Sequence, residues 1–177
     1  MNKLLSLALS LIAVAALLRA QDIPRPDVPD QIKAPSAEQV ILVAYATGSQ
    51  IYTCEFSGGT YEWKLKAPDA ELHDYQGTII GHHFAGPTWK HNDGSEVTGK
   101  AVAKANSPQP DSIPWLLVTA TGHSGIGAFT RVTSIQRVHT KGGQPPVADC
   151  NASKSNSEAR SAYTADYYFY APAPQAK

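Results

Sequence analysis

The stretch Tyr52–Lys66, Y-T-C-E-F-S-G-G-T-Y-E-W-K-L-K, decides the class of fold. Apolar and polar side chains alternate along both of its halves, and a Ser-Gly-Gly turn separates the halves. This pattern is typical of an antiparallel hairpin with one face buried and the other in water. Tyr163–Tyr170 repeats the same period of two, and no amphipathic helical pattern of comparable length occurs. The sequence therefore predicts an all-β fold.

Further strands are expected on both sides of this hairpin. Val40–Ala46 is apolar on both alternating sets, as in a central strand, and Pro68–Glu71 breaks the hairpin pattern. The remaining strands are expected at residues 78–91 with a bend at Gly86-Pro87, 96–104, 115–121 and 129–140. About eight or nine short strands without an internal repeat predict a single domain over residues 38–170. Its expected architecture is an antiparallel, jelly-roll-like β-sandwich or a small barrel, with long loops.

The N-terminal residues 1–20 have the layout of a secretory signal peptide. A lysine near the start precedes an uncharged apolar run, Leu4–Leu18, and Ala20 suits the position before a cleavage site. That run is shorter than the roughly 20 residues of a membrane-spanning helix. We therefore expect an exported protein, periplasmic or extracellular, with no integral membrane segment after cleavage. Residues 21–37 carry four prolines and predict an extended arm that either wraps the domain or acts as a linker, and residues 171–177 predict a tail.

The charge balance argues against nucleic acid as a partner. The chain has 15 basic and 15 acidic residues, and loss of Lys3 and Arg19 with the signal would leave a slight acidic excess. No run of five or more basic residues occurs, so neither nucleic acid nor an anionic membrane is an expected ligand.

The only two cysteines, Cys54 and Cys150, predict a disulfide in an exported chain. A zinc site is the weaker reading, because neither cysteine has a second one nearby. The chain-entropy model gives roughly 4–5 kcal/mol for a bridge that closes a loop of about 95 residues.

The stretch Thr78–Gly99, T-I-I-G-H-H-F-A-G-P-T-W-K-H-N-D-G-S-E-V-T-G, holds three of the six histidines and one of the three tryptophans. His82 and His83 are neighbours on an expected strand and point to opposite faces. His82 shares its face with larger apolar side chains and is the expected half-buried structural histidine. Gly81 is expected to leave room beside His83, which makes His83 the candidate site residue.

His83, His91 and Asp93 could converge on one pocket beside a partly exposed Trp89. The Gly86-Pro87 bend would bring the two imidazoles together, and Trp89 would supply a flat apolar wall. Such a group could bind a transition metal or act as a base with an orienting carboxylate. Ordinary hydrogen-bonded histidines at a polar strand edge are the alternative. No cofactor is predicted, and a bound metal is left open.

Two weaker candidates lie elsewhere. His123 belongs to the glycine-rich loop Gly122–Gly127, which does not fit the G-x-S-x-G nucleophile elbow because its second glycine falls one place late and no helix follows. Tyr168 and Tyr170 share a face with Asp166 and could line a groove, whereas the two remaining tryptophans, Trp63 and Trp115, are expected in the core.

Several segments together resemble one family of secreted bacterial and fungal proteins that is known only as a domain of unknown function. The segments are I-Y-T-C (51–54), W-K-L (63–65), G-H-H-F-A-G-P-T-W (81–89), D-G-S-E-V-T-G (93–99), I-P-W-L-L (113–117), I-Q-R-V-H-T-K-G-G (135–143) and Y-T-A-D-Y-Y-F-Y (163–170). The resemblance covers residues 38–170 and implies no activity. Some fungal relatives carry a malate-dehydrogenase label, but this chain has no G-x-G-x-x-G after a strand and no alternating βα pattern.

Two functions remain open from the sequence. The favoured one is a non-enzymatic binding domain for a glycan, a small molecule or a surface partner, because the chain lacks a catalytic signature. The alternative is a small secreted hydrolase or lyase, with or without a metal, that uses His83, His91 and Asp93 with a contribution from His123.

Overall fold

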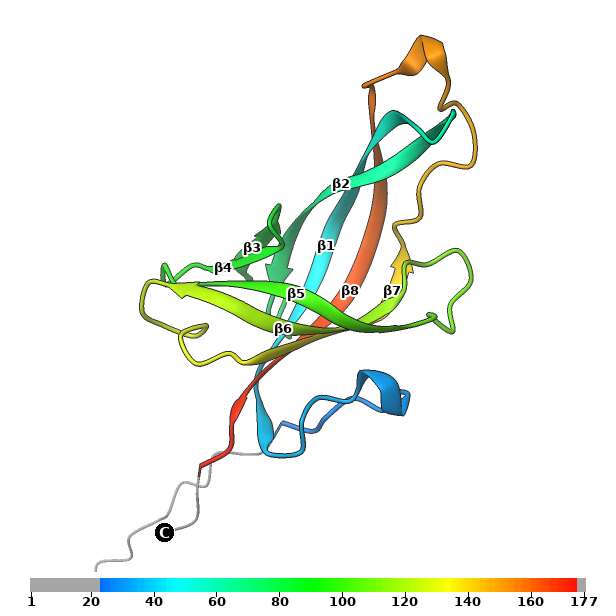
Figure 1. Ribbon diagram of the computed structural model, residues 1–177. Coiled ribbons are helices and arrows are strands. Elements are labelled where there is room, and N and C mark those ends of the chain that lie inside the picture. The colour runs from blue at the N-terminus through cyan, green and yellow to red at the C-terminus, as the bar shows by residue number, and fades with distance from the viewer. Residues whose placement is uncertain (1–22, 175–177) are drawn as a thin grey trace, which may run out of the picture.

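Eight antiparallel strands form one sheet that closes into a barrel (Figure 1). This computed structural model describes residues 23–174. The strands are β1 (Glu38–Ser57), β2 (Thr60–His73), β3 (Ile79–Phe84), β4 (Thr88–His91), β5 (Glu96–Ala105), β6 (Trp115–Ser124), β7 (Ser134–Gly142) and β8 (Glu158–Pro172). Each strand pairs with the next along the chain, and β8 returns to β1. The all-β expectation is confirmed, and of the two expected architectures the barrel is the one formed. Two short 3-10 turns, η1 (Asp30–Ile32) and η2 (Ala152–Lys154), are the only helical elements in the described part of the chain.

Strands β1 and β2 are longer than the sequence pattern indicates. β1 runs without interruption for 20 residues and β2 for 14, so the expected break at Pro68–Glu71 is wrong. Pro68 is tolerated inside β2 because it pairs with Gln50 beside a register shift at Ile51/Tyr52, where the ladder is already irregular. Gly48 lets the two strands approach closely, since a Cβ there would lie 2.2 Å from the Asp69 carbonyl oxygen.

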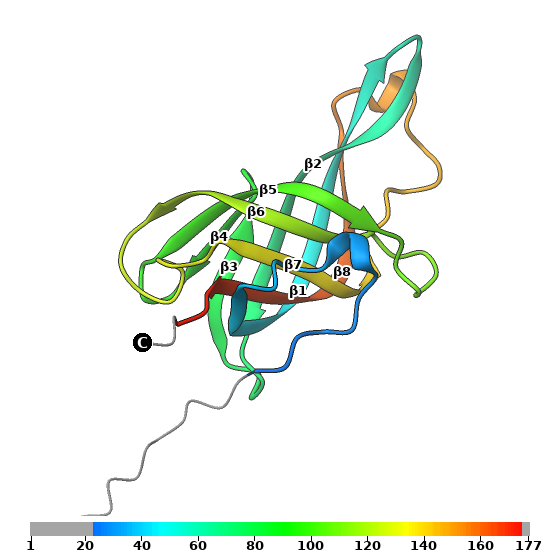
Figure 2. The same ribbon diagram turned by 60° about the horizontal axis from the view of Figure 1, so that its bottom comes forward.

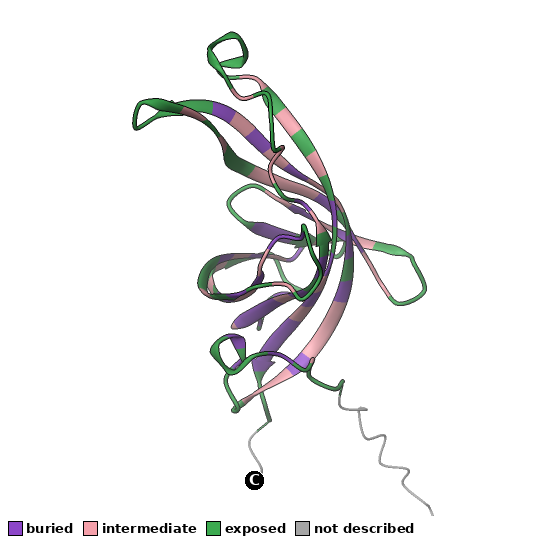
Figure 3. Ribbon diagram, turned by 90° about the vertical axis from the view of Figure 1, so that its right-hand side faces the viewer, coloured by how far each residue is buried: buried purple, intermediate pink, exposed green. Residues whose placement is uncertain are grey.

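The far ends of β1 and β2 project beyond the barrel together with the start of β8 and the loop after β7 (Figure 1). Figure 3 shows that the tip of this projection is mostly exposed, whereas the buried positions follow the strands of the barrel. The predicted disulfide, Cys54–Cys150, joins β1 to that loop. It therefore fastens a segment that buries little of its own surface.

Strands β3 and β4 form a hairpin, where the sequence predicted one bent strand. The chain reverses at Ala85–Pro87, and Gly86 has a φ of 117°, a conformation that favours glycine. As a result His83 pairs directly with Trp89, and Gly81 pairs with His91. Gly81 does not leave an open space, because a Cβ there would lie 2.3 Å from the Lys90 carbonyl oxygen of the neighbouring strand.

One end of the barrel is filled by apolar side chains. Phe129 is fully buried, and its ring centroid lies 4.5 Å from that of Phe169 on β8. The strand expected at residues 129–140 begins only at Ser134, because residues 128–131 form a turn that carries Phe129 into the barrel. Asp93 supports this turn: its carboxylate accepts hydrogen bonds from the backbone N–H groups of Ser95 and Ala128, at 2.9 and 2.8 Å.

The proline-rich arm packs along the outside of the barrel (Figure 2). Ile32 in η1 is fully buried in an outer cluster with Trp115 and Val138, and Gln136 Nε2 donates to the Ile32 carbonyl at 2.6 Å. Of the two expectations for the arm, the described residues 23–37 thus follow the one in which it wraps the domain.

Ala171 and Pro172 still belong to β8, so the last strand runs into the expected tail. The expected signal peptide, residues 1–20, lies outside the described residues. Among residues 23–174, no helix has the length and apolar character needed to cross a membrane.

Candidate functional site

A pocket of about 320 Å³ opens into the barrel at the end opposite Phe129. Its volume falls at the lower end of the range of about 300–1,000 Å³ that small-molecule sites occupy. Residues from all eight strands and from the β3–β4 turn line it: Gln50, Leu65, Pro68, His83, Pro87, Trp89, Gly99, Lys100, Ala101, Leu116, Val118, Arg137 and Tyr167. Most of these groups are apolar or aromatic, and a few polar groups stand among them.

Three rings that pack against one another, those of His83, Trp89 and Tyr167, separate the pocket from the filled end of the barrel. The imidazole of His83 lies parallel to the indole of Trp89, with centroids 4.3 Å apart and planes 10° apart. Tyr167 meets both rings edge-on, at 5.2 Å from His83 and 5.6 Å from Trp89. This floor is rigid because each ring is at most 3% exposed. The expectation of a partly exposed Trp89 is wrong, since its pairing with His83 turns it inward.

His83 is a neutral imidazole at the floor of the pocket. Its Nδ1 lies 2.9 Å from the Thr88 carbonyl oxygen, so Nδ1 carries the hydrogen and Nε2 remains an acceptor. Burial, with a smaller contribution from the nearby Arg137 charge, lowers the pKa of His83 to about 3. His83 is therefore uncharged at neutral pH and cannot supply a positive charge to a ligand.

Arg137 on β7 supplies a half-buried positive charge to the pocket. It pairs with Tyr167 and Leu116 in the two neighbouring strands, and its Nη2 donates to the Pro114 carbonyl at 2.8 Å. Its Nε is buried without a hydrogen-bond partner in the described chain. Burial raises the pKa of the Tyr167 hydroxyl, and the Arg137 charge partly offsets that rise. The guanidinium is thus close enough to the floor of the pocket for its charge to affect the pKa of the Tyr167 hydroxyl.

The lining of the pocket contains no carboxylate. Lys100 and Arg137 are both present, and within residues 23–174 neither forms an ion pair. A half-buried guanidinium without a counter-ion is costly for a folded protein. The pocket is consequently positive in charge although its walls are mainly apolar.

Polar atoms without partners gather around this pocket. In the part of the chain that the structure describes, seven buried side-chain nitrogen or oxygen atoms have no hydrogen-bond partner. Four of them belong to residues of the lining, namely Gln50 Nε2, Trp89 Nε1, Arg137 Nε and the Tyr167 hydroxyl, and a fifth is the hydroxyl of Tyr163. All five can donate a hydrogen. Because buried donors are normally paired, such a concentration marks a place where a partner binds or side chains rearrange.

His91 and Asp93 lie away from His83, towards the filled end of the barrel. His91 Nδ1 is 3.0 Å from Asp93 Oδ2, and the imidazole packs edge-on against Phe129 at 5.7 Å. Hydrogen bonds from Ser95 and Ala128 hold the pKa of Asp93 well below its usual range. Asp93 thus organises its own turn and the turn that carries Phe129. Among residues 23–174, no group of three or more His, Cys, Asp or Glu side chains is arranged to hold a metal ion, so the alternative set His83, His91 and Asp93 does not come together.

The remaining candidates of the sequence are dispersed. His123 is exposed, and its Nε2 lies 2.7 Å from the Val132 carbonyl oxygen. Tyr168 and Tyr170 point to the outer face of β8, where the arm covers them and the Tyr170 hydroxyl donates to Gln136 Oε1. They do not line a free groove, because Ala34 and Arg25 of the arm pack on Tyr170.

Of the two adjacent histidines, His83 lines the pocket as expected, but it is the more deeply buried of the two. His82 faces outward, with 45% of its side chain exposed, and its Nε2 lies 2.9 Å from Asp69 Oδ1. His83 is the buried one, at 3% exposure. The reason is the register of the β3–β4 hairpin, which directs His83 and Trp89 into the barrel together.

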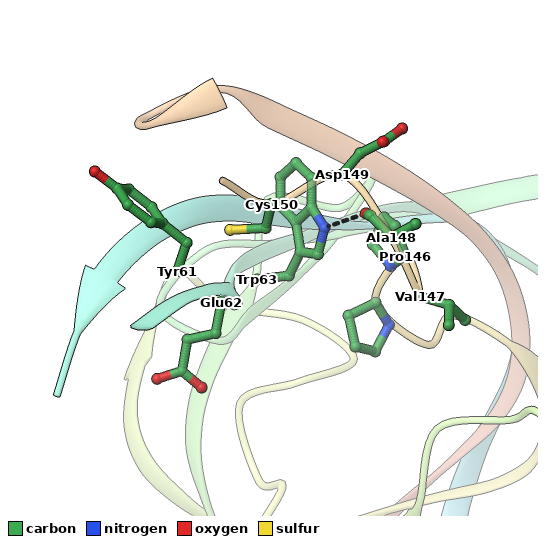
Figure 4. Close-up of a pocket in the computed structure, with 9 residues that line it drawn as sticks. Tyr61, Glu62, Trp63, Pro146, Val147, Ala148, Asp149 and Cys150 are labelled. Carbon is green, nitrogen blue, oxygen red and sulfur yellow. Dashed lines mark hydrogen bonds between the residues drawn. The ribbon is translucent and has the colours of Figure 1, made fainter. Parts of the chain in front are cut away.

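A second hollow of about 340 Å³ lies at the projecting end, between β2 and the disulfide loop (Figure 4). Figure 4 shows Trp63 against residues 145–150, with its Nε1 donating to the Ala148 carbonyl at 3.0 Å. Trp63 is half-buried here and does not belong to the barrel core, contrary to expectation. The polar groups of Trp63 and Ala148 are already paired, and Val147 points into solvent, so this hollow is a surface feature of the loop.

Sequence reasoning found His83 and Trp89 of the barrel pocket and missed Gln50, Arg137 and Tyr167. Arg137 did carry a signal, since a charged residue shares a strand face with the apolar Ile135. Tyr167 shares a face with Phe169, which the alternation of β8 indicates correctly. The pattern does not tell which face of β8 is inside, because both faces carry aromatic side chains.

The fold and the pocket define a closed, eight-stranded antiparallel barrel that holds a ligand-sized space in its mouth. The chain belongs to the family described as protein of unknown function (DUF3455), whose profile matches residues 35–171. The expected membership in a domain-of-unknown-function family is thereby confirmed, and the family brings no activity with it. No curated protein and no solved structure matches the chain.

Proposed function

We propose that this protein is an exported, non-enzymatic binding protein that holds a small, largely apolar molecule in the mouth of the barrel. The observation that carries the proposal is the pocket of about 320 Å³ above the floor of His83, Trp89 and Tyr167. An eight-stranded barrel is just wide enough to be filled by side chains or to hold one small ligand. Here side chains fill one end and leave the other open.

The chemistry of the lining favours binding over catalysis. His83 is neutral, is hydrogen-bonded to the Thr88 carbonyl and stacks on Trp89, so it forms part of the pocket surface. No serine, threonine or cysteine is among the lining residues, so the pocket offers no hydroxyl or thiol nucleophile of those kinds next to the imidazole. The walls also disfavour a glycan, because sugar hydroxyls against apolar side chains would lose their hydrogen bonds to water. Export is proposed from the signal-like residues 1–20 and is compatible with the disulfide.

The size of the pocket limits the ligand. At about 30 Å³ for each molecule of liquid water, the volume corresponds to roughly ten waters. A molecule with one or two fused rings, or a short branched chain, matches this space. A long lipid chain would have to extend out of the mouth.

The proposal is tested with N-phenylnaphthylamine, a neutral apolar dye whose fluorescence rises in apolar surroundings. Titration of the purified protein should give a saturable rise with one site. Ala101→Phe, which places a ring at the mouth of the pocket, should weaken binding by at least about tenfold, equivalent to about 1.4 kcal/mol. Ala101 is suited to this test because it lines the pocket and is exposed, so the larger side chain can be accommodated without displacing the core.

Val102→Phe is the matched control. Val102 is the next residue along β5, is 56% exposed and does not line the pocket, so the same ring added there should leave dye binding unchanged. The proposal is wrong if the unmodified protein shows no saturable signal, or if Ala101→Phe binds the dye as tightly as Val102→Phe.

A further inference from the structure

We propose that the ligand of the barrel pocket is a small monoanion, such as an aromatic or short-chain carboxylate, whose acid group lies against Arg137. This inference rests on the proposed function and specifies the class of ligand. Its basis is the juxtaposition of one half-buried guanidinium without a counter-ion, a lining without carboxylates and an apolar floor of three rings.

The charge of Arg137 decides the sign of the ligand. A guanidinium removed from water loses hydration, and only an opposite charge or several acceptors can compensate it. The protein supplies one acceptor, the Pro114 carbonyl at 2.8 Å, and no carboxylate in the lining. A cationic ligand would add repulsion from both Arg137 and Lys100. A neutral ligand would leave the guanidinium without a counter-charge.

The neighbours of Arg137 favour an acceptor-rich group. Tyr167 pairs with Arg137 across β7 and β8, and its hydroxyl lies close enough to Arg137 and Tyr163 for both groups to affect its pKa but makes no hydrogen bond of good geometry within the described residues. Gln50 is 1% exposed, lines the same pocket and has an Nε2 without a partner. Both groups can donate to a carboxylate, which accepts up to about four hydrogen bonds. A single acid group would thus satisfy donors from three strands.

The number of charges favours a monoanion. One half-buried guanidinium neutralises one negative charge, and His83 contributes none because its pKa is lowered to about 3. Lys100 is exposed at the mouth and stays hydrated, so it attracts anions from solution more than it binds them. A phosphate monoester, with nearly two charges, would remain undercompensated in this site.

The apolar part of the ligand lies against the rings. The parallel stack of His83 and Trp89 presents a flat surface, and Leu116 and Val118 from β6 form the adjacent wall. Gly99 lets β5 approach this wall, since a Cβ there would lie 2.5 Å from Val118 Cγ1 and 3.4 Å from the Trp89 ring. A planar ring system fits such a surface better than a sugar or a peptide.

The test compares two probes of the same shape and different charge, naphthoate and naphthamide, in competition with N-phenylnaphthylamine. The unmodified protein should bind naphthoate at least about tenfold more tightly than naphthamide, since hydrogen bonds between charged groups are worth about 1.5–3 kcal/mol. Arg137→Gln should abolish this preference, and a urea-unfolding transition like that of the unmodified protein shows that the variant is folded. The matched control is Lys100→Gln, which removes the same charge at the mouth and should keep most of the preference.

A measurement at high ionic strength distinguishes the contribution of Lys100 from that of Arg137 independently of the variants. At about 1 M salt the Debye length falls to about 3 Å, so attraction by exposed Lys100 is screened, whereas a direct contact with Arg137 persists.

Equal affinity for naphthoate and naphthamide, with normal dye binding, would overturn the inference and leave the binding function standing. A preference that survives Arg137→Gln would overturn it as well. Failure of all three probes to bind would instead contradict the proposed function itself. If Arg137→Gln does not fold, the comparison of naphthoate with naphthamide on the unmodified protein at low and high salt decides alone.

Discussion

Two adjacent histidines show how much one position in a strand changes the chemistry of a side chain. His82 lies on the outside, paired with Asp69, and stays in contact with water. His83 lies inside, stacked on Trp89 and bonded to the Thr88 carbonyl. The difference follows from the alternation of a strand together with the register of the β3–β4 hairpin. His83 is consequently a structural part of the pocket floor whose ring must be uncharged.

The burial of His83 predicts acid sensitivity of the fold well above the range in which carboxylates titrate. A histidine in the unfolded chain takes up a proton below about pH 6.5. In the folded protein His83 stays neutral until the pH approaches its lowered pKa of about 3. Because the unfolded state binds the proton first, the stabilising contribution is complete above pH 6.5 and declines as the pH falls. Relative to His83→Phe, the unmodified protein should lose about 1 kcal/mol of unfolding free energy between about pH 6.5 and 5.5.

Urea unfolding of both proteins at these two pH values measures the effect. The other five histidines are present in both proteins, so their contributions cancel in the difference. Phenylalanine keeps a ring against Trp89 and removes only the titrating group and its bond to Thr88. Identical pH dependence in the two proteins would mean that His83 is not the buried neutral group described here.

At this scale, the sequence predicted which side chains share a face and failed to predict which face is inside. Thr78–Phe84 carries apolar residues on both faces, so hydrophobicity alone did not orient His82 and His83. The same ambiguity hid Tyr167 and Arg137. Their positions depend on closure of the barrel, which brings β1 to β8 over more than 100 residues of chain. No local pattern contains that information.

At the scale of elements, the proline-rich arm acts as an outer layer of the barrel. Residues 23–37 cover the outer side chains of β6, β7 and β8, and Trp115 is buried there against the arm. The prolines explain why the sequence indicates an extended segment, and the contacts explain why it is not a free linker. Arg25 adds to the attachment by donating to the carbonyls of Ala34 and Pro35 and by lying over the Tyr170 ring at 5.2 Å.

Ile32 provides a test of this attachment. It is fully buried between the arm and the barrel, so Ile32→Ala should lower the unfolding free energy by about 2–4 kcal/mol, the usual cost of truncating a buried isoleucine. Ile23→Ala in the same arm is the control, since Ile23 is 38% exposed and its truncation should cost less than about 0.5 kcal/mol. Unfolding by urea, followed by tryptophan fluorescence, measures both. Small and equal effects would mean that the arm is detached in solution.

Strand lengths were the other feature that the sequence predicted incompletely at this scale. The hairpin at Tyr52–Lys66 was expected and is the middle of a much longer pair, because Pro68 fits into β2 beside an irregular register. Gly86-Pro87 was expected to bend a strand, and a full reversal there produces the hairpin that places Trp89. In neither case did the proline itself reveal the geometric outcome, which depended on the neighbouring strand: β2 continues through Pro68, and the chain reverses at Gly86-Pro87.

At the scale of the whole molecule, the chain has two regions that are held by different means. The barrel is held by its apolar interior, by the arm and by the ring of paired strands. The projecting hairpin and the loop of residues 143–157 have little buried apolar surface, and the disulfide joins them across a sequence separation of 96 residues. Backbone hydrogen bonds from Asn156 to Cys54 and from Cys54 to Ser157 reinforce the same junction.

This division predicts that stability and ligand binding respond differently to loss of the bridge. Replacing both Cys54 and Cys150 by serine should lower the unfolding free energy by about 2–5 kcal/mol, because the unfolded chain regains the freedom of a long closed loop. Binding of N-phenylnaphthylamine at low temperature should stay within about threefold of the unmodified protein, since neither cysteine lines the pocket and the floor rests on β3, β4 and β8. Urea unfolding and dye titration on the same samples measure the two effects, and the chemically reduced unmodified protein should behave like the double variant. A double variant that unfolds at the same urea concentration as the oxidised protein would show that the bridge adds no stability. A double variant that folds but has lost dye binding would show that the projecting end shapes the pocket, so that the two regions are not independent.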